Sequence, residues 1–278
     1  MSMTSLPLPA GPGASLGELL RAWRQRRRRS QLDLALDADV SQRHLSFIKS
    51  GRSGASREMV LRLAEQLDVP LRERNALLLA AGYAPLYAER PLDDPAMHAV
   101  RRTVELILRA HMPHPALAVN RHWQLVSANA AVAPLMAGVA DTALLAPPVN
   151  VLRLSLHPRG LAPHIANLPE WRAHLLERLQ RQVGISADPI LAALLAELAA
   201  LDVPPASGLA GSALPALSPP GDIAVPLELD TTQGRLSLIS TTTVFGTPTE
   251  VTLSELAIEA FYPADDDTAE RLTGLQRG

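Results

Sequence analysis

A cluster of hydrogen-bonding side chains in the N-terminal part of the sequence has the chemistry needed to read DNA bases. Gln42 can form two hydrogen bonds with adenine, and Arg43 can form two with guanine. Ser41 and Ser46 can contact either a base or a phosphate. Side chains of these types at the start of a helix are typical of a segment that lies in the major groove.

Two neighbouring helices are expected to position these side chains. Residues 41–50 predict a helix because Leu45 and Ile48 give it an apolar inner face, opposite the polar one. Residues 31–38 predict the preceding helix, and a tight turn at 39–40 separates the two. This arrangement is a helix-turn-helix. The alternative is an ordinary small helical bundle with one polar face.

Further cations and polar groups around this motif can contact the phosphate backbone. Gln31 opens the first helix of the motif, where the helix N-terminus favours an anion. The remaining candidates for DNA contact are Arg28, Arg29, His44 and Arg52. An alternative for the basic run at 26–29 is a solvated end of the preceding helix, where cations also interact favourably with the helix dipole.

The charge of the chain is distributed unevenly between its two parts. Residues 16–90 contain 14 Arg and Lys against 9 Asp and Glu, a net charge of +5, whereas the rest of the chain has a net charge of -7. Only the first part is therefore expected to meet a polyanion. Double-stranded DNA is the predicted partner.

The sequence predicts two domains. Five short helices are expected in a DNA-binding domain at 16–84, after a disordered N-terminus at 1–15. Proline and weak periodicity predict a linker at 85–95, and a second domain should cover 96–264, followed by a solvated tail at 265–278. A loop rich in Pro and Gly is expected at 203–221.

The second domain mixes helical and strand patterns, which predicts an α+β fold. Helices are expected at 95–110, 129–136, 149–156, 169–182 and 189–201, and strands at 116–119, 123–127, 225–229, 234–243 and 250–262. This part is rich in Leu, Ala and Val but poor in aromatic residues, so its core could leave room for a ligand. Asn150 and Arg153 are predicted as the polar end of such a pocket, beside Trp123. In the alternative, Arg153 pairs with an acidic residue of the domain, and Trp123 belongs to the core.

No pattern in the sequence indicates catalysis or a metal site. Catalytic motifs are absent, and the chain contains no cysteine. His111 and His114 lack a third ligand at a defined spacing, so we expect no metal. No apolar run is long enough to cross a bilayer, and no signal peptide is recognised. We therefore expect a soluble, cytoplasmic protein that is not an enzyme and has no contact with membranes.

Several segments resemble a known family of regulators. Ser30-Gln-Leu-Asp-Leu-Ala, Val40-Ser-Gln-Arg-His-Leu-Ser-Phe and Ser50-Gly-Arg are similar to the XRE-type helix-turn-helix, with its lambda-repressor-like fold. Pro70-Leu-Arg-Glu-Arg-Asn, Asn120-Arg-His-Trp and Leu156-His-Pro-Arg-Gly-Leu resemble regulators with an MmyB-like domain. The resemblance implies a PAS-like second domain with an apolar pocket, which in some members holds a fatty-acyl-type ligand.

Two readings of the second domain follow for this sequence. In the first, the domain senses a small apolar or fatty-acyl-like molecule and changes the geometry of a homodimer on DNA. In the alternative, the domain only dimerises or binds a protein partner.

The sequence also departs from the family pattern, because Asp39 occupies a turn position that is usually glycine. Aspartate tolerates a left-handed backbone, so the turn should survive.

Overall fold

The structure, a computed structural model, describes residues 13–202, 225–246 and 248–275. It divides into two compact units. One comprises Met1–Arg90 with Gln180–Ala192 and Thr247–Ser254, and the other comprises Pro91–Leu179, Ala193–Gly246 and Glu255–Gly278. The main boundary thus falls within the predicted linker. The predictions for residues 1–12 and for the loop at 203–221 lie outside the described residues.

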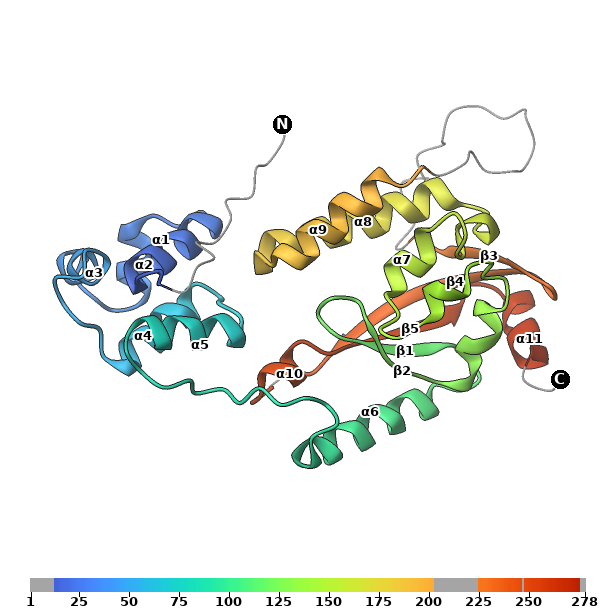
Figure 1. The fold of residues 1–278 in the computed structure, drawn as a ribbon, viewed down its shortest axis with the longest axis horizontal. Helices are drawn as coiled ribbons and strands as arrows, with labels where there is room; N and C mark the ends of the chain where they lie inside the picture. The colour runs from blue at the N-terminus through green and yellow to red at the C-terminus, as the bar shows by residue number, and fades with distance from the viewer. Residues whose placement is uncertain (1–12, 203–224, 247, 276–278) are drawn as a thin grey trace. The chain divides into compact units, whose positions relative to one another are not determined.

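Residues 13–84 form the five expected helices, which Figure 1 shows as α1 to α5. Their bounds are Leu16–Arg26, Gln31–Asp37, Gln42–Lys49, Arg57–Gln66 and Leu71–Ala80. Each of the first four begins at a serine whose hydroxyl accepts a hydrogen bond from a backbone N–H of the first turn. Such a cap contributes about 1 kcal/mol, so the starts of these helices are set by local sequence.

The ends of these helices share one backbone motif. After each helix a residue with positive φ reverses the chain, and the N–H of the following residue bonds to a carbonyl oxygen five positions back. In the helix-turn-helix this residue is Asp39, with φ 52°, and Val40 N donates to Ala35 O at 2.9 Å. The aspartate therefore adopts the left-handed turn that the sequence predicts.

The core of the first unit forms between the inner faces of these helices. Trp23, Leu34, Leu45, Leu63 and Leu77 are at most 1% exposed. Burial of side chains of this size stabilises the fold by about 1.5–3 kcal/mol each. The packing of α1, α2 and α3 fixes which face of α3 remains in solvent.

The first part of the predicted linker is attached to α5. Asn75 Oδ1 accepts hydrogen bonds from the N–H groups of Leu86 and Tyr87, both at 3.0 Å, and its Nδ2 donates to Tyr87 O at 2.7 Å. Arg72 forms an ion pair with Glu89 at 2.6 Å. The Asn75 side chain thus satisfies three backbone groups of residues 86 and 87, which weak periodicity could not reveal.

The second unit is built on an antiparallel five-stranded sheet, which confirms the α+β prediction. Its strands are β1 (Ala116–Val119), β2 (Leu125–Ala128), β3 (Leu227–Thr231), β4 (Gly234–Val244) and β5 (Ala257–Pro263), in the order β2-β1-β5-β4-β3. The last strand in the sequence therefore lies at the centre of the sheet. The expected strand at 250–262 is divided into helix α10 (Val251–Ser254) and β5.

Helical segments lie before, between and after the strands. They are η1 (Pro95–Met97), α6 (His98–Ala110), η2 (Ala130–Met136), η3 (Thr142–Leu145), α7 (Val151–Leu156), η4 (Ala162–His164), α8 (Leu168–Ser186), α9 (Pro189–Ala200) and α11 (Asp266–Leu275). The expected solvated tail is in fact α11 as far as Leu275, with Leu272 buried and Thr268 Oγ1 accepting a hydrogen bond from Ser237 N at 3.0 Å. Packing of α11 against β4 orders this segment despite its acidic start.

Alternation along the strands gives the sheet two different faces. On one face, small and branched side chains pack against Val104 and Leu108 of α6; they are Ala116, Ala118, Ile258 and Ala260. The intervening residues of β1 and β5 point to the opposite face, towards α7 and α8. That second face contains the cavity described below.

Candidate functional site

The outer face of α3 is available for contact with another molecule. Ser41, Gln42, Arg43 and Ser46 are exposed. Ser41 Oγ accepts a hydrogen bond from His44 N at 3.2 Å and so caps the helix. The capping serine thereby holds the first turn of α3, where side chains of a groove-binding helix reach the base edges.

Arg43 and Phe47 form a pair on this outer face. The Arg43 guanidinium lies 5.4 Å from the centre of the Phe47 ring, and within the described residues it forms no ion pair. The side chain therefore keeps its net charge and a preferred direction. Both properties suit bidentate contact with a guanine or a phosphate.

The other predicted DNA-contacting residues have more varied surroundings. Gln31 Nε2 donates to Gln42 O at 3.4 Å, which connects the start of α2 to the start of α3. Arg29 forms an ion pair with Asp37. Arg28 and Arg52 are exposed. The structure therefore brings Gln31 next to the recognition residues and partly neutralises Arg29.

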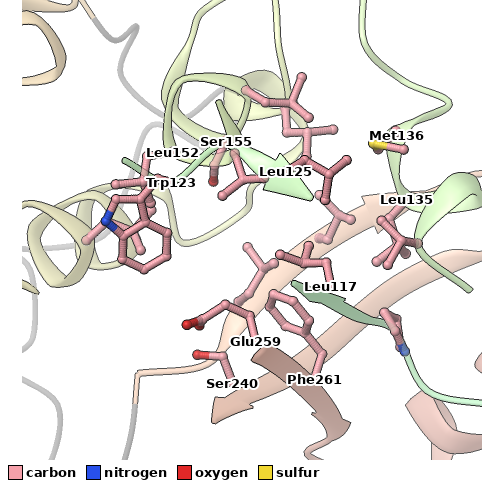
Figure 2. A pocket seen from close by; sticks show the side chains of 18 of the residues that line it. Leu117, Trp123, Leu125, Leu135, Met136, Leu152, Ser155, Ser240, Glu259 and Phe261 are labelled. Atoms are coloured by element: carbon pink, nitrogen blue, oxygen red, sulfur yellow. The ribbon is translucent and has the colours of Figure 1, made fainter. Parts of the chain in front are cut away.

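A mainly apolar cavity of about 110 Å³ lies between the sheet and the helices of the second unit. One water needs roughly 10–15 Å³ on the same scale, so the space suits a small organic molecule. Figure 2 shows part of its lining, with Leu117, Leu125 and Phe261 beside Leu135 and Met136. Further lining residues are Pro115, Val132, Val149, Val151, Leu152, Leu154, Leu161, Trp171, Leu175, Leu227 and Leu229.

Trp123 lines this cavity from a strained turn. Its φ is 62°, a left-handed value that bulky residues seldom adopt. Asn120 stabilises the turn, because its Oδ1 accepts hydrogen bonds from His122 N at 2.9 Å and Gln124 N at 3.0 Å. Trp123 thus belongs to a turn, and β2 begins only at Leu125 rather than at 123 as predicted.

The polar groups of the cavity lie around a buried ion pair. Arg178 donates to both oxygens of Glu259, at 2.9 Å from Nη1 and 2.5 Å from Nη2. The Glu259 side chain is 5% exposed, and the Arg178 guanidinium stacks on Trp123 at 4.5 Å from the ring centre. Ser240 lies beside Glu259 in Figure 2. One end of the cavity is therefore polar but carries balanced charges.

Asn150 and Arg153, which the sequence predicts at this polar end, do not line the cavity. Asn150 caps α7, since its Oδ1 accepts a hydrogen bond from Arg153 N at 3.0 Å, and its Nδ2 donates to His122 O at 2.9 Å. Arg153 forms two hydrogen bonds with Glu197, at 2.5 and 2.7 Å, on a solvent-exposed side of α7. Their spacing of three residues reflects helix capping, and Arg153 has the acidic partner expected in the alternative reading.

Sequence reasoning missed Arg178 and Glu259, although each carried a signal. Arg178 follows Trp171 and Leu175 at spacings of seven and three residues, so it shares their face of α8. Glu259 interrupts an otherwise apolar strand at a position that alternates with Phe261. A charged residue in a buried strand requires a partner, which the sequence cannot name.

The histidines considered as metal ligands have other contacts. His111 Nε2 forms a 3.0 Å hydrogen bond with Phe261 O, and its ring packs edge-on against Tyr262. Burial lowers the pKa of His114, and the neighbouring His111 lowers it further. Among the described residues no group of three potential ligands gathers, and none of their helices is long and apolar enough to span a bilayer.

Comparison with known families finds matches in two regions of the chain. Residues 20–74 match a helix-turn-helix model, and residues 100–275 match the model of the MmyB-like transcription regulator ligand binding domain. A search of curated proteins found no match. The second family match covers more than half of the chain and confirms the resemblance seen in the sequence. The chain therefore belongs to the family of MmyB-like transcription regulators, which combine a DNA-binding helix-turn-helix with a ligand-binding domain.

Proposed function

We propose that α3 reads base pairs in the major groove through Gln42 and Arg43, with Ser41 and Ser46 as additional contacts. The observation that carries this proposal is the exposed polar face of α3, whose opposite face is buried through Leu45. The net charge of +5 over residues 16–90 adds a general attraction to DNA. Arg28, Arg29, Gln31, His44 and Arg52 are proposed to contact the backbone or the flanking bases.

Selection of binding sites from a library of random duplexes tests this proposal with the full-length chain. The chain should enrich one motif, and the double substitution of Gln42 and Arg43 by alanine should abolish the enrichment. Arg57→Ala is a matched control, because Arg57 is also exposed and basic but belongs to α4. Enrichment of the same motif by the double variant would contradict the proposal.

We further propose a homodimer on a two-fold symmetric site. A single recognition helix contacts only a few base pairs, which gives little discrimination against a genome of competing sites. Two copies place two helices about 34 Å apart, or a multiple of it, on one side of the duplex. Light scattering of the chain at micromolar concentration, free and bound to DNA, checks this. A monomer in both states would contradict it.

The cavity of the second unit is proposed to bind a small, mainly aliphatic molecule. Each methylene transferred from water into this lining contributes about 0.8 kcal/mol before entropy and strain are subtracted. The cavity favours this reading over a domain that only dimerises, because a core without a ligand is normally packed without large voids. To regulate transcription, the molecule must bind one state of the protein more tightly than another.

Octanol is a suitable probe of this cavity. It should raise the melting temperature of the full-length chain in proportion to its occupancy. Leu135→Phe, which adds volume to the lining, should abolish this shift, while Leu106→Phe should not, because Leu106 is 62% exposed on α6. An equal shift in both variants would contradict binding in the cavity. Mass spectrometry of molecules extracted from the purified chain would then identify the natural ligand.

A further inference from the structure

The ion pair at the polar end of the cavity is already complete without a ligand. Arg178 makes three hydrogen bonds, two to Glu259 and one to Thr242 Oγ1 at 2.5 Å, and its face is covered by Trp123. The positive charge is therefore balanced by a carboxylate of the protein itself. The side chains of the pair are 17% and 5% exposed, so water screens them little.

The Glu259 side chain cannot easily turn away from Arg178. It lies on β5, the central strand, directly opposite Leu117 of β1 on one side and Thr242 of β4 on the other. Pairing on both sides fixes the direction of its side chain. A ligand could take the place of Glu259 only by leaving a buried carboxylate without its cation, which is a strongly unfavourable state.

From this arrangement we infer that the cavity selects an aliphatic molecule with a neutral polar end, such as an amide, an alcohol or an ester, and discriminates against a free carboxylate. The inference rests on the proposed ligand-binding role of the cavity and specifies its ligand. A carboxylate would add a second negative charge beside Glu259 with no second cation among the lining residues that the structure describes. A neutral group adds no net charge to the buried site.

Neutral hydrogen-bonding groups are present to recognise such a ligand. Ser155 Oγ accepts a hydrogen bond from Trp171 Nε1 at 3.1 Å, and its own O–H can still donate to a ligand oxygen. Ser240 is paired with Phe261 across the strands, and its hydroxyl can both donate and accept. Both serines line the cavity, so a carbonyl or hydroxyl group can be satisfied without disturbing the ion pair.

Calorimetric titration of the full-length chain with octanoate, octanamide and octanol tests this inference. Octanamide and octanoate have nearly the same shape, so a difference between them reports the charge. At neutral pH and below micelle-forming concentrations, octanamide and octanol should each bind at least about tenfold more tightly than octanoate. Equal or tighter binding of octanoate would overturn the inference and leave the proposed ligand site intact.

Substitutions of the ion pair provide the reversed test. Glu259→Gln removes the balancing charge and leaves Arg178 in place, so it should shift the preference at least about tenfold towards octanoate. The double variant Arg178→Gln with Glu259→Gln has no charge and should again favour octanamide. An unchanged preference for octanamide over octanoate in Glu259→Gln would overturn the inference. If that variant does not fold, the preferences of the wild type and the double variant still test the inference. Binding of none of the three probes to the wild type would overturn the proposed ligand site, and this inference with it.

Discussion

The two arginines that define the candidate sites, Arg43 on α3 and Arg178 at the cavity, are in opposite electrostatic states. Arg43 is exposed, stacks on Phe47 and, among the described residues, forms no ion pair. Arg178 is largely buried and neutralised by Glu259. The same side chain type is therefore available to an anion in one unit, while in the other it maintains a polar but balanced lining. Exposure and pairing, rather than residue type, decide what an arginine can bind.

Removal of the buried arginine should give the largest effect. Arg178→Ala leaves Glu259 buried without a cation, and we expect a loss of about 3–5 kcal/mol in the free energy of unfolding of the second unit. Denaturant titration monitored by tryptophan fluorescence checks this, since Trp123 and Trp171 both lie in this unit. The paired replacement Arg178→Met with Glu259→Leu should recover most of the loss. A single variant as stable as the wild type would show that the pair is not desolvated.

Removal of the exposed arginine should affect binding instead of folding. Arg43→Ala should weaken binding to the selected DNA site by about 1–3 kcal/mol, and binding to a random duplex much less, because a base contact is lost. Titrations on both duplexes measure the difference, and circular dichroism confirms that the fold is kept. An equal loss on the two duplexes would assign Arg43 to the phosphate backbone.

Arg28 and Arg29, two adjacent cations after α1, extend the comparison of arginines in different electrostatic states. Arg28→Ala should weaken binding to all duplexes alike and reduce the slope of log affinity against log salt by about 0.9, the effect of one phosphate contact. Arg29→Ala should reduce the slope less, because Arg29 already pairs with Asp37. Affinity measurements over a series of salt concentrations separate the two variants. A larger change for Arg29 would indicate that its ion pair opens on DNA.

The exposed ion pair of Arg153 and Glu197 should give the smallest effect. Their side chains are 38% and 42% exposed, so Arg153→Ala should lower the free energy of unfolding by at most about 1 kcal/mol and leave octanol binding unchanged. The hydrogen bond from Arg153 lowers the pKa of Glu197. This contribution is therefore present at neutral pH and is lost as the pH falls through the lowered pKa. Unfolding measured at several pH values should show this loss, which would support the assignment. A clear loss of octanol affinity in Arg153→Ala would contradict it.

The sequence alone determined most of the first unit. Helix start and stop signals and the spacing of Leu45 and Ile48 are all local, and they predicted the five helices and the exposed face of α3. Interactions over three to five residues fix these features, so no knowledge of distant residues was needed. The α+β class of the second unit followed in the same way, from the periodicity of its segments.

Only the tertiary structure decided the polar end of the cavity. Arg178 and Glu259 are 81 residues apart in the sequence, and their contact depends on β5 entering the centre of the sheet. The sequence pattern favoured Asn150 and Arg153 because they lie three residues apart, but capping and an outward-facing partner account for that spacing. Local periodicity shows which face of a strand or helix a residue occupies. Which faces meet depends on long-range strand pairing, and the sequence of any one segment does not contain that information.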